Sequence, residues 1–175
     1  MPLELGAVCP PFELPGTDGK NHSLDEVTTE LLVVMTFCNH CPYTIAYEPR
    51  LVRLANEYMP KGVGFVAINP NDATRYPDDG MEAMKTRARE RGFPFPYLRD
   101  DPQKFTRALG PRFTPEIYVF DGARKLRYHG RIDDNHRDES RVSSHDLRNA
   151  LDALLAGGEP PVTETVAFGC SVKWK

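Results

Sequence analysis

Two segments of the chain consist almost entirely of apolar residues, many of them branched at Cβ. They are LLVVMTF (Leu31–Phe37) and VGFVAIN (Val63–Asn69). Uninterrupted runs of this kind are typical of strands that are buried on both faces, as the central strands of a helix-covered parallel sheet are. We therefore expect two adjacent parallel strands at the centre of the fold.

A helix is predicted between these strands, over residues 42–59. Apolar residues recur there at helical spacing, as at Leu51, Leu54 and Tyr58. Pro42 suits the first turn of a helix, where the N–H that proline lacks has no intrahelical partner. Pro49 is expected to kink this helix.

Three further helices are expected. A polar one covers residues 79–91, and a second runs from an Asp101 cap to a Gly110 terminator. Ser143 and Asp146 are expected to open the last helix, whose leucines form one apolar stripe.

Two β-hairpins are indicated by Asp-Gly steps between short apolar segments, because this dipeptide tolerates the positive φ of tight turns. The flanking segments are Phe12–Leu14 with His22–Leu24, around Asp18 and Gly19, and EIYVF with KLRYHG, around Asp121 and Gly122. The order of elements predicts an α/β fold, in which a mixed sheet has helices on both faces. No repeat or linker divides the chain, so we expect a single domain over residues 1–175.

The last residues, 159–175, are expected to form an extended tail packed along the body. Apolar residues alternate with small or polar ones from Val166 to Trp174, the pattern of a half-buried strand. Cys170 lies on the apolar side. Two interpretations stay open: a small buried residue, or a third redox thiol. The first is favoured because burial makes a thiol a poor nucleophile, and Cys9 is interpreted as structural too.

Composition excludes several classes of function. The chain has 22 Lys and Arg against 25 Asp and Glu, mixed along its length, so neither a nucleic-acid groove nor a polybasic membrane patch is indicated. We find no signal-peptide pattern at the N-terminus and no apolar run of membrane-spanning length. We expect a cytoplasmic protein with reduced thiols.

The candidate chemistry lies in FCNHCPY, where Cys38 and Cys41 are separated by two residues. The first follows a buried strand and the second begins a helix, where unpaired N–H groups favour a thiolate. The spacing lets one thiol attack a mixed disulfide formed by the other. We expect Cys38 to be the nucleophile with the lower pKa and Cys41 to resolve.

A metal site is the competing interpretation of this pair. One Cys-x-x-Cys supplies half of a zinc site, and Cys9 and Cys170 complete it only if both ends of the chain meet there. The acidic pairs Asp78–Asp79, Asp100–Asp101 and Asp133–Asp134 lack calcium-loop spacing and are interpreted as caps and turns. We expect neither a metal nor a cofactor.

Four segments together resemble the thioredoxin-like redoxins related to alkyl hydroperoxide reductase and thiol-specific antioxidant proteins. They are FCNHCPY, GFVAINPND, FPFPYLRDD and FTPEIYVFD. The CNHCPY centre and the GCSVKW tail are similar to those of a group of small bacterial thioredoxin-like proteins. The resemblance implies a thioredoxin-like fold over most of the chain.

The resemblance also implies further site residues. A cis proline at Pro115, after Thr114, faces the cysteine pair in such folds and presents backbone to a substrate peptide. His40 resembles the histidine of the disulfide isomerase centre and is expected to stabilise the thiolate. The other neighbours of the pair, Phe37, Asn39 and Pro42, are expected to tune it.

The function indicated is thiol-disulfide exchange, with protein disulfides as substrates and an upstream thiol as reductant. A peroxiredoxin-like peroxidase is the alternative, but the Pro-x-x-x-Thr/Ser-x-x-Cys run of such enzymes is missing, and Arg131 is interpreted as a surface residue. A non-catalytic binding module is disfavoured by the intact pair. Members of the thioredoxin family often have a buried carboxylate six residues before the first cysteine, where it transfers protons. Leu32 occupies that position here, so His40 or water must transfer the proton of the thiol. The sequence indicates no oligomeric state.

Overall fold

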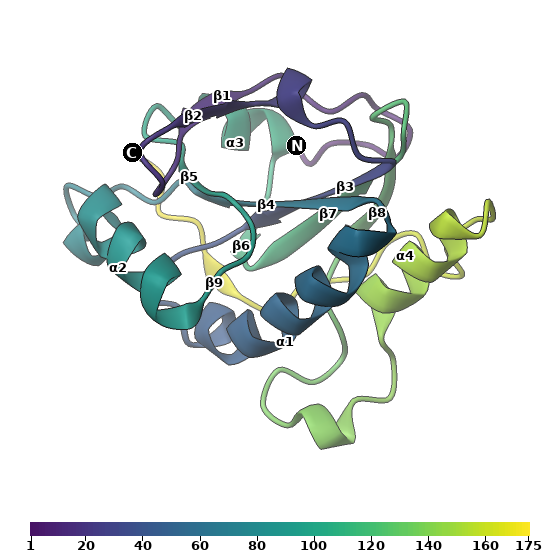
Figure 1. Cartoon of the computed structure of the whole chain (residues 1–175). Helices are drawn as coiled ribbons and strands as arrows, with labels where there is room; N and C mark the ends of the chain where they lie inside the picture. Colours follow the sequence, from purple (N-terminus) through teal and green to yellow (C-terminus); the bar gives the residue numbers. More distant parts are fainter.

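The computed structural model describes residues 1–175 (Figure 1). Its strands are β1 (Glu13–Pro15), β2 (Asn21–Ser23), β3 (Leu31–Thr36), β4 (Val63–Asn69), β5 (Tyr97–Arg99), β6 (Phe113–Thr114), β7 (Glu116–Phe120), β8 (Leu126–Gly130) and β9 (Cys170–Ser171). Its α-helices are α1 (Pro42–Tyr58), α2 (Met81–Arg91), α3 (Lys104–Leu109) and α4 (Asp146–Leu155). None of them combines the length and hydropathy that crossing a bilayer requires.

A mixed five-stranded sheet forms the centre, in the order β5-β4-β3-β7-β8. β3 runs parallel to β4 and antiparallel to β7, so the two apolar runs are the adjacent parallel strands that the sequence predicts. Both predicted hairpins form, as β1-β2 and β7-β8. The central position of β3 places its carboxyl end, and the cysteine motif after it, in the middle of the sheet edge.

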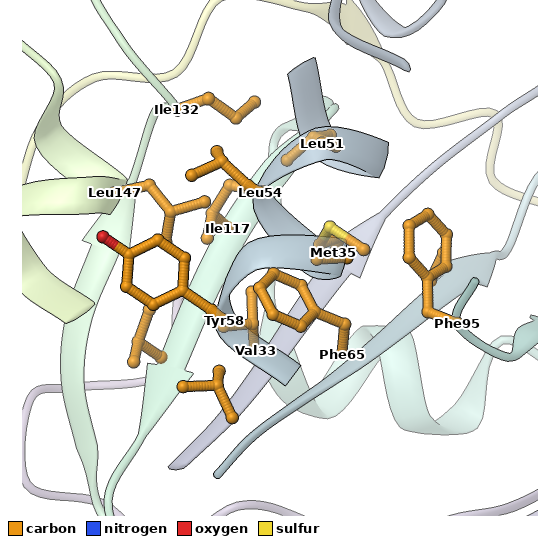
Figure 2. Close-up of a cluster of buried hydrophobic side chains, with 14 of the residues drawn as sticks. Val33, Met35, Leu51, Leu54, Tyr58, Phe65, Phe95, Ile117, Ile132 and Leu147 are labelled. Atoms are coloured by element: carbon orange, nitrogen blue, oxygen red, sulfur yellow. The ribbon is translucent and has the colours of Figure 1, made fainter. Parts of the chain in front are cut away.

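One face of the sheet packs against α1, α2 and α4. Val33 and Met35 of β3 belong to this core, and Figure 2 shows them facing Leu51, Leu54 and Tyr58 of α1. The helix runs unbroken through Pro49. The residues of β3 that bury themselves here alternate with those of the opposite face, as the period of two in a strand requires.

The other face is covered differently. Leu32 and Val34 of β3 pack there against Phe12 of the N-terminal segment and Phe105 of α3. Cys9 is buried in this same core. This face is therefore closed by the hairpin, the N-terminal chain and one short helix, whereas α1, α2 and α4 share the first face.

Three helices begin later than the sequence predicts, and the first of them is α2, which starts at Met81 and not at residue 79. α3 starts at Lys104 with Gln103 as N-cap, and the expected cap Asp101 lies at the surface instead. The carboxylate of Asp100 does the capping, because it accepts hydrogen bonds from the backbone N–H and the hydroxyl of Thr106 at 2.8 and 2.7 Å. At α4, His145 is the N-cap. Ser143 does not open that helix, because it donates to Asp134 instead.

The C-terminal tail returns across the molecule from the end of α4 to β9, beside β6 (Figure 1). The expected alternation fails at Val166, which is 72 % exposed, while Ala167 is buried. From Cys170 onwards the tail is in phase, with Ser171 exposed and Val172 buried. The tail alternates as a strand does beside β6, whereas at Glu164 it forms only an isolated bridge with His129 of β8.

Candidate active site

Cys38 and Cys41 lie at the junction of β3 and α1. Cys38 follows the last residue of β3 by two positions, and Cys41 is the N-cap of α1 with Pro42 at its first position. Both cysteines are almost inaccessible, at 2 % and 0 % exposure. The sequence therefore places the pair correctly at a strand-to-helix turn, but the structure buries it.

The loop at Thr114 and Pro115 faces both sulfurs. The bond between these residues is cis, which confirms the expectation from the resemblance. The Thr114 hydroxyl lies 3.3 Å from the sulfur of Cys38, and the Thr114 carbonyl lies 3.2 Å from that of Cys41. A single residue thus offers a hydroxyl to one sulfur and a backbone acceptor to the other.

Thr36, the last residue of β3, fixes this loop. Its hydroxyl donates to the carbonyl of Phe113 at 2.8 Å and accepts the backbone N–H of Glu116 at 3.0 Å. These two residues flank Thr114 and Pro115. The strand that leads into the cysteine motif therefore also holds the loop opposite, although sequence reasoning gave Thr36 no role.

The two thiols share one proton. The pKa of Cys41 is lowered to about 4, first by the hydrogen bond with Cys38 and further by the backbone N–H groups of Thr44 and Cys170. The pKa of Cys38 is raised by the same hydrogen bond and by burial. We expected the lower pKa on Cys38. The structure gives the opposite direction, and the interaction between the two thiols is its largest cause.

His40 contacts a buried carboxylate. Its Nδ1 atom lies 2.7 Å from an oxygen of Asp79, which is fully buried, whereas the imidazole itself remains 30 % exposed. The ring also stacks on Tyr76, with centroids 5.6 Å apart and planes inclined by 6°. The imidazole is thus fixed in orientation between the solvent and an acid.

Asp79 is the functional candidate that sequence reasoning missed. Its carboxylate also accepts hydrogen bonds from the backbone N–H of Asn39 at 2.7 Å and from the side chains of Asn69 and Asn71 at 3.1 and 3.0 Å. The sequence predicts a cap or turn at this residue, and Asp79 does end the short 3-10 helix η3 (Pro77–Asp79). The available signal was the set of polar residues from the end of the buried strand β4 to α2, which includes Asn69, Asn71 and Asp79.

Asn39, Phe37 and Pro42, the other neighbours of the cysteine pair, make no hydrogen bond to either sulfur. Asn39 is held on both sides, because its side chain donates to the carbonyl of Asp78 at 2.7 Å and accepts from the Tyr97 hydroxyl at 2.8 Å. Phe37 is buried among the aromatic rings of Phe93, Phe95 and Tyr97. Pro42 is exposed at the start of the helix.

A third cysteine joins the pair from the tail. Cys170 lies opposite Thr114 in the antiparallel pairing of β9 with β6, and its side chain interacts with that of Cys41. Cys9 is in the other core and takes no part. Arg131 pairs with Asp146 at 2.7 Å, and Leu32 is buried in the sheet, so neither supplies a charge to the sulfurs.

One cluster has the composition of a metal site. The donor atoms of Cys38, His40 and Asp79 all lie within 4.8 Å of one another. A cation bound there has to separate the imidazole from its acid, since these two groups are already in contact. The second candidate pattern of the sequence, a site completed by Cys9, is excluded by the position of that residue in the other core.

The chain is similar to a known protein family and to two proteins of known structure. A family profile described as AhpC/TSA matches residues 5–129. The crystal structure of an uncharacterized conserved protein from Geobacillus kaustophilus is 46% identical, with a TM-score of 0.94, over 98% of this chain and 93% of that one. A hypothetical protein from Sinorhizobium meliloti is 33% identical, with a TM-score of 0.94, over 100% and 97%.

The fold extends to more distant proteins. The thioredoxin domain of a thiol-disulfide oxidoreductase from Bacteroides vulgatus aligns at 19% identity with a TM-score of 0.61, over 71% of this chain and 86% of that one. The chain therefore has the thioredoxin-like fold. A search of curated protein sequences gave no match.

Proposed function

The chain belongs to the AhpC/TSA family, and on that premise we propose that it is a thiol-disulfide oxidoreductase that reduces protein disulfides with Cys38 and Cys41. The observation that supports this best is the contact of Thr114 with both sulfurs. Its hydroxyl can donate to a thiolate on Cys38, and its carbonyl can accept from a thiol on Cys41.

At rest the negative charge lies on Cys41, whose pKa is the lower. Transfer of the shared proton from Cys38 to Cys41 gives a Cys38 thiolate and a Cys41 thiol. The Thr114 hydroxyl then donates to the thiolate, and the Cys41 thiol donates to the Thr114 carbonyl. The loop thereby stabilises the form that attacks, since thiolates and not thiols are nucleophilic.

The exchange proceeds in two displacements. The Cys38 thiolate attacks one sulfur of the substrate disulfide, so that a mixed disulfide forms and the other substrate sulfur leaves as a thiolate. Cys41 then attacks the sulfur of Cys38, its proton passes to a leaving sulfur, and the second substrate thiol is released. The pair ends as a disulfide, and the substrate ends as one thiol and one thiolate, which takes up a proton from water; two electrons have passed from the pair to the substrate.

We place this reaction in a reducing compartment with an upstream dithiol as electron donor, because such compartments return the disulfide to the dithiol. The chain has 22 basic and 25 acidic residues, and this balance supports no nucleic-acid partner. Peroxide reduction remains the second activity to compare, since the family name includes it.

Insulin reduction with dithiothreitol tests the proposal. The wild type should accelerate it, Cys38→Ser should abolish the acceleration, and Cys41→Ser should accumulate a mixed disulfide on Cys38. Cys9→Ser is the matched control, because that thiol is buried in the other core. If Cys38→Ser retains the wild-type rate, or if peroxide is consumed faster than insulin disulfides, the assignment is wrong.

A further inference from the structure

The tail occupies the position at Thr114 where a substrate peptide is expected to pair with the backbone. β9 forms an antiparallel ladder with β6, in which Cys170 faces Thr114 and Ser171 faces Phe113. Facing residues of such a ladder have Cα atoms about 4.5 to 5.5 Å apart. The chain's own cysteine is thereby brought to the dithiol in the way that a substrate cysteine is.

The approach is close because of one residue. A Cβ atom on Gly169 would lie 2.5 Å from the carbonyl oxygen of Thr114 and 2.8 Å from the Cβ of Phe113. Only glycine fits, since real side chains do not approach backbone so closely. The position before Cys170 thus lets the tail lie directly on the loop that contacts both sulfurs.

Buried polar side chains anchor the tail beyond Cys170. The backbone N–H of Lys173 donates to Asn71 at 2.9 Å, and its carbonyl accepts from Gln103 at 3.1 Å and from the N–H of Asp72 at 2.9 Å. Asn71 and Gln103 are 0 % and 1 % exposed. Such anchors hold the strand in register and give Cys170 a defined place.

From this arrangement we propose that Cys170 is a third redox residue, which takes the disulfide over from Cys38 and passes it to an external dithiol protein. The inference rests on the proposed function of the pair. Its basis is access: Cys38 and Cys41 are 2 % and 0 % exposed, whereas Cys170 is partly open to solvent. A protein reductant reaches Cys170 without displacing the tail.

The transfer is an isomerisation and needs no added oxidant. The Cys170 thiolate attacks the sulfur of Cys41 in the Cys38–Cys41 disulfide. A Cys41–Cys170 bond forms, the Cys38–Cys41 bond breaks, and Cys38 leaves as a thiolate that takes up the proton lost by Cys170. The external dithiol then attacks Cys170, releases Cys41, and is itself oxidised when its second thiol resolves the mixed disulfide.

The ionisation of Cys170 is compatible with this order. In the dithiol state its pKa is raised to about 11, by burial and by interaction with Cys41. Oxidation of Cys41 removes the second of these causes, while Lys173 continues to favour the charge. Cys170 therefore becomes a better nucleophile only when there is a disulfide for it to attack.

Disulfide mapping tests the transfer directly. The wild type and Cys38→Ser are oxidised mildly with oxidised glutathione. Their remaining free thiols are then alkylated at acidic pH, and the proteins are digested with trypsin. We expect a linkage between the peptide that ends at Arg50 and the one that ends at Lys173, at a high yield in Cys38→Ser. Wild-type protein that contains only the Cys38–Cys41 bond, together with Cys38→Ser that stays reduced at Cys41 and Cys170, would falsify the proposal.

A second variant separates position from chemistry. Gly169→Val should lift the tail from β6 and abolish the Cys41–Cys170 linkage with every thiol still present. Gly158→Ala is the matched control, because a Cβ there meets its nearest atom at an ordinary 3.5 Å. The fluorescence of Trp174, the one tryptophan, reports the displacement. Equal yields of the linkage in both variants would contradict the role of the ladder.

Reduction kinetics distinguish this inference from the function of the pair. Oxidised wild type and Cys170→Ser are reduced with thioredoxin and, separately, with dithiothreitol. The ratio of the thioredoxin rate to the dithiothreitol rate should fall about tenfold in Cys170→Ser. An unchanged ratio overturns the inference even when insulin reduction is normal, and a mapped linkage without insulin reduction overturns only the function of the pair.

Discussion

The imidazole of His40 and the carboxylate of Asp79 meet at 2.7 Å, although one comes from the cysteine motif and the other from the turn after β4. Asp79 also raises the pKa of Cys38 through its negative charge. The acid thus acts on the thiol pair both directly and through the histidine that it orients.

Replacement of this acid should affect both stability and ionisation. In Asp79→Asn, an amide N–H₂ group replaces an oxygen that accepts hydrogen bonds from Asn71 or from Asn39 and Asn69, so the variant should lose about 2 kcal/mol in the free energy of unfolding. Removal of the negative charge should also lower the pKa of Cys38. Urea unfolding and the pH dependence of thiol alkylation measure the two effects.

Asp78→Asn is the control for this change. It removes the same charge from the neighbouring residue, which is exposed. We expect its stability to change by no more than about 0.5 kcal/mol. If both variants lost the same free energy of unfolding, the buried hydrogen bonds of Asp79 would not contribute to stability.

The charge of the pair should follow the pKa of Cys41, which is lowered to about 4. At neutral pH one thiolate is therefore present, and it takes up a proton as the pH falls through about 4. Ultraviolet absorbance of the thiolate measures this transition. Cys41→Ser should show little thiolate at neutral pH, because burial raises the pKa of Cys38, so Cys38 should form its mixed disulfide more slowly in that variant; full thiolate absorbance there would place the charge on Cys38.

The packing of α1 against the sheet should contribute strongly to the free energy of unfolding. Leu51→Ala removes a fully buried side chain between α1 and β3 and should cost about 2 to 5 kcal/mol. Ile45→Ala, on the same helix but 37 % exposed, should change stability by about 0.5 kcal/mol or less. Chemical unfolding of both variants checks this, and a similar loss for the two would show that α1 is not packed as described.

Much of the fold follows from the apolar pattern alone. The runs at Leu31–Phe37 and Val63–Asn69 predict the central strands because burial on both faces leaves no polar position, and the Asp-Gly steps predict the hairpins. Helix starts were less predictable. The sequence does not distinguish Asp100 from Asp101 as the residue that caps α3. The path of the chain decides that the carboxylate of Asp100 reaches Thr106.

The candidate site divides in the same way. Cys38 and Cys41 are local in sequence, so a strand followed by a proline-led helix predicts their arrangement. Asp79, Thr36 and Cys170 arrive from distant segments, and their contacts depend on how the strands order themselves in the sheet. Local pattern contains no information about that order.

The alternation of β3 has a further consequence for the way the chain tolerates change. Its residues point by turns into two separate apolar compartments, one shared with α1 and one with α3. Leu51 and Phe105 lie on opposite sides of the sheet and have no common cluster, so the energetic effects of replacing them should sum. Substitutions in the core around Phe105 should therefore change stability independently of those in the core around Leu51. They should also leave the geometry of the cysteine pair unchanged.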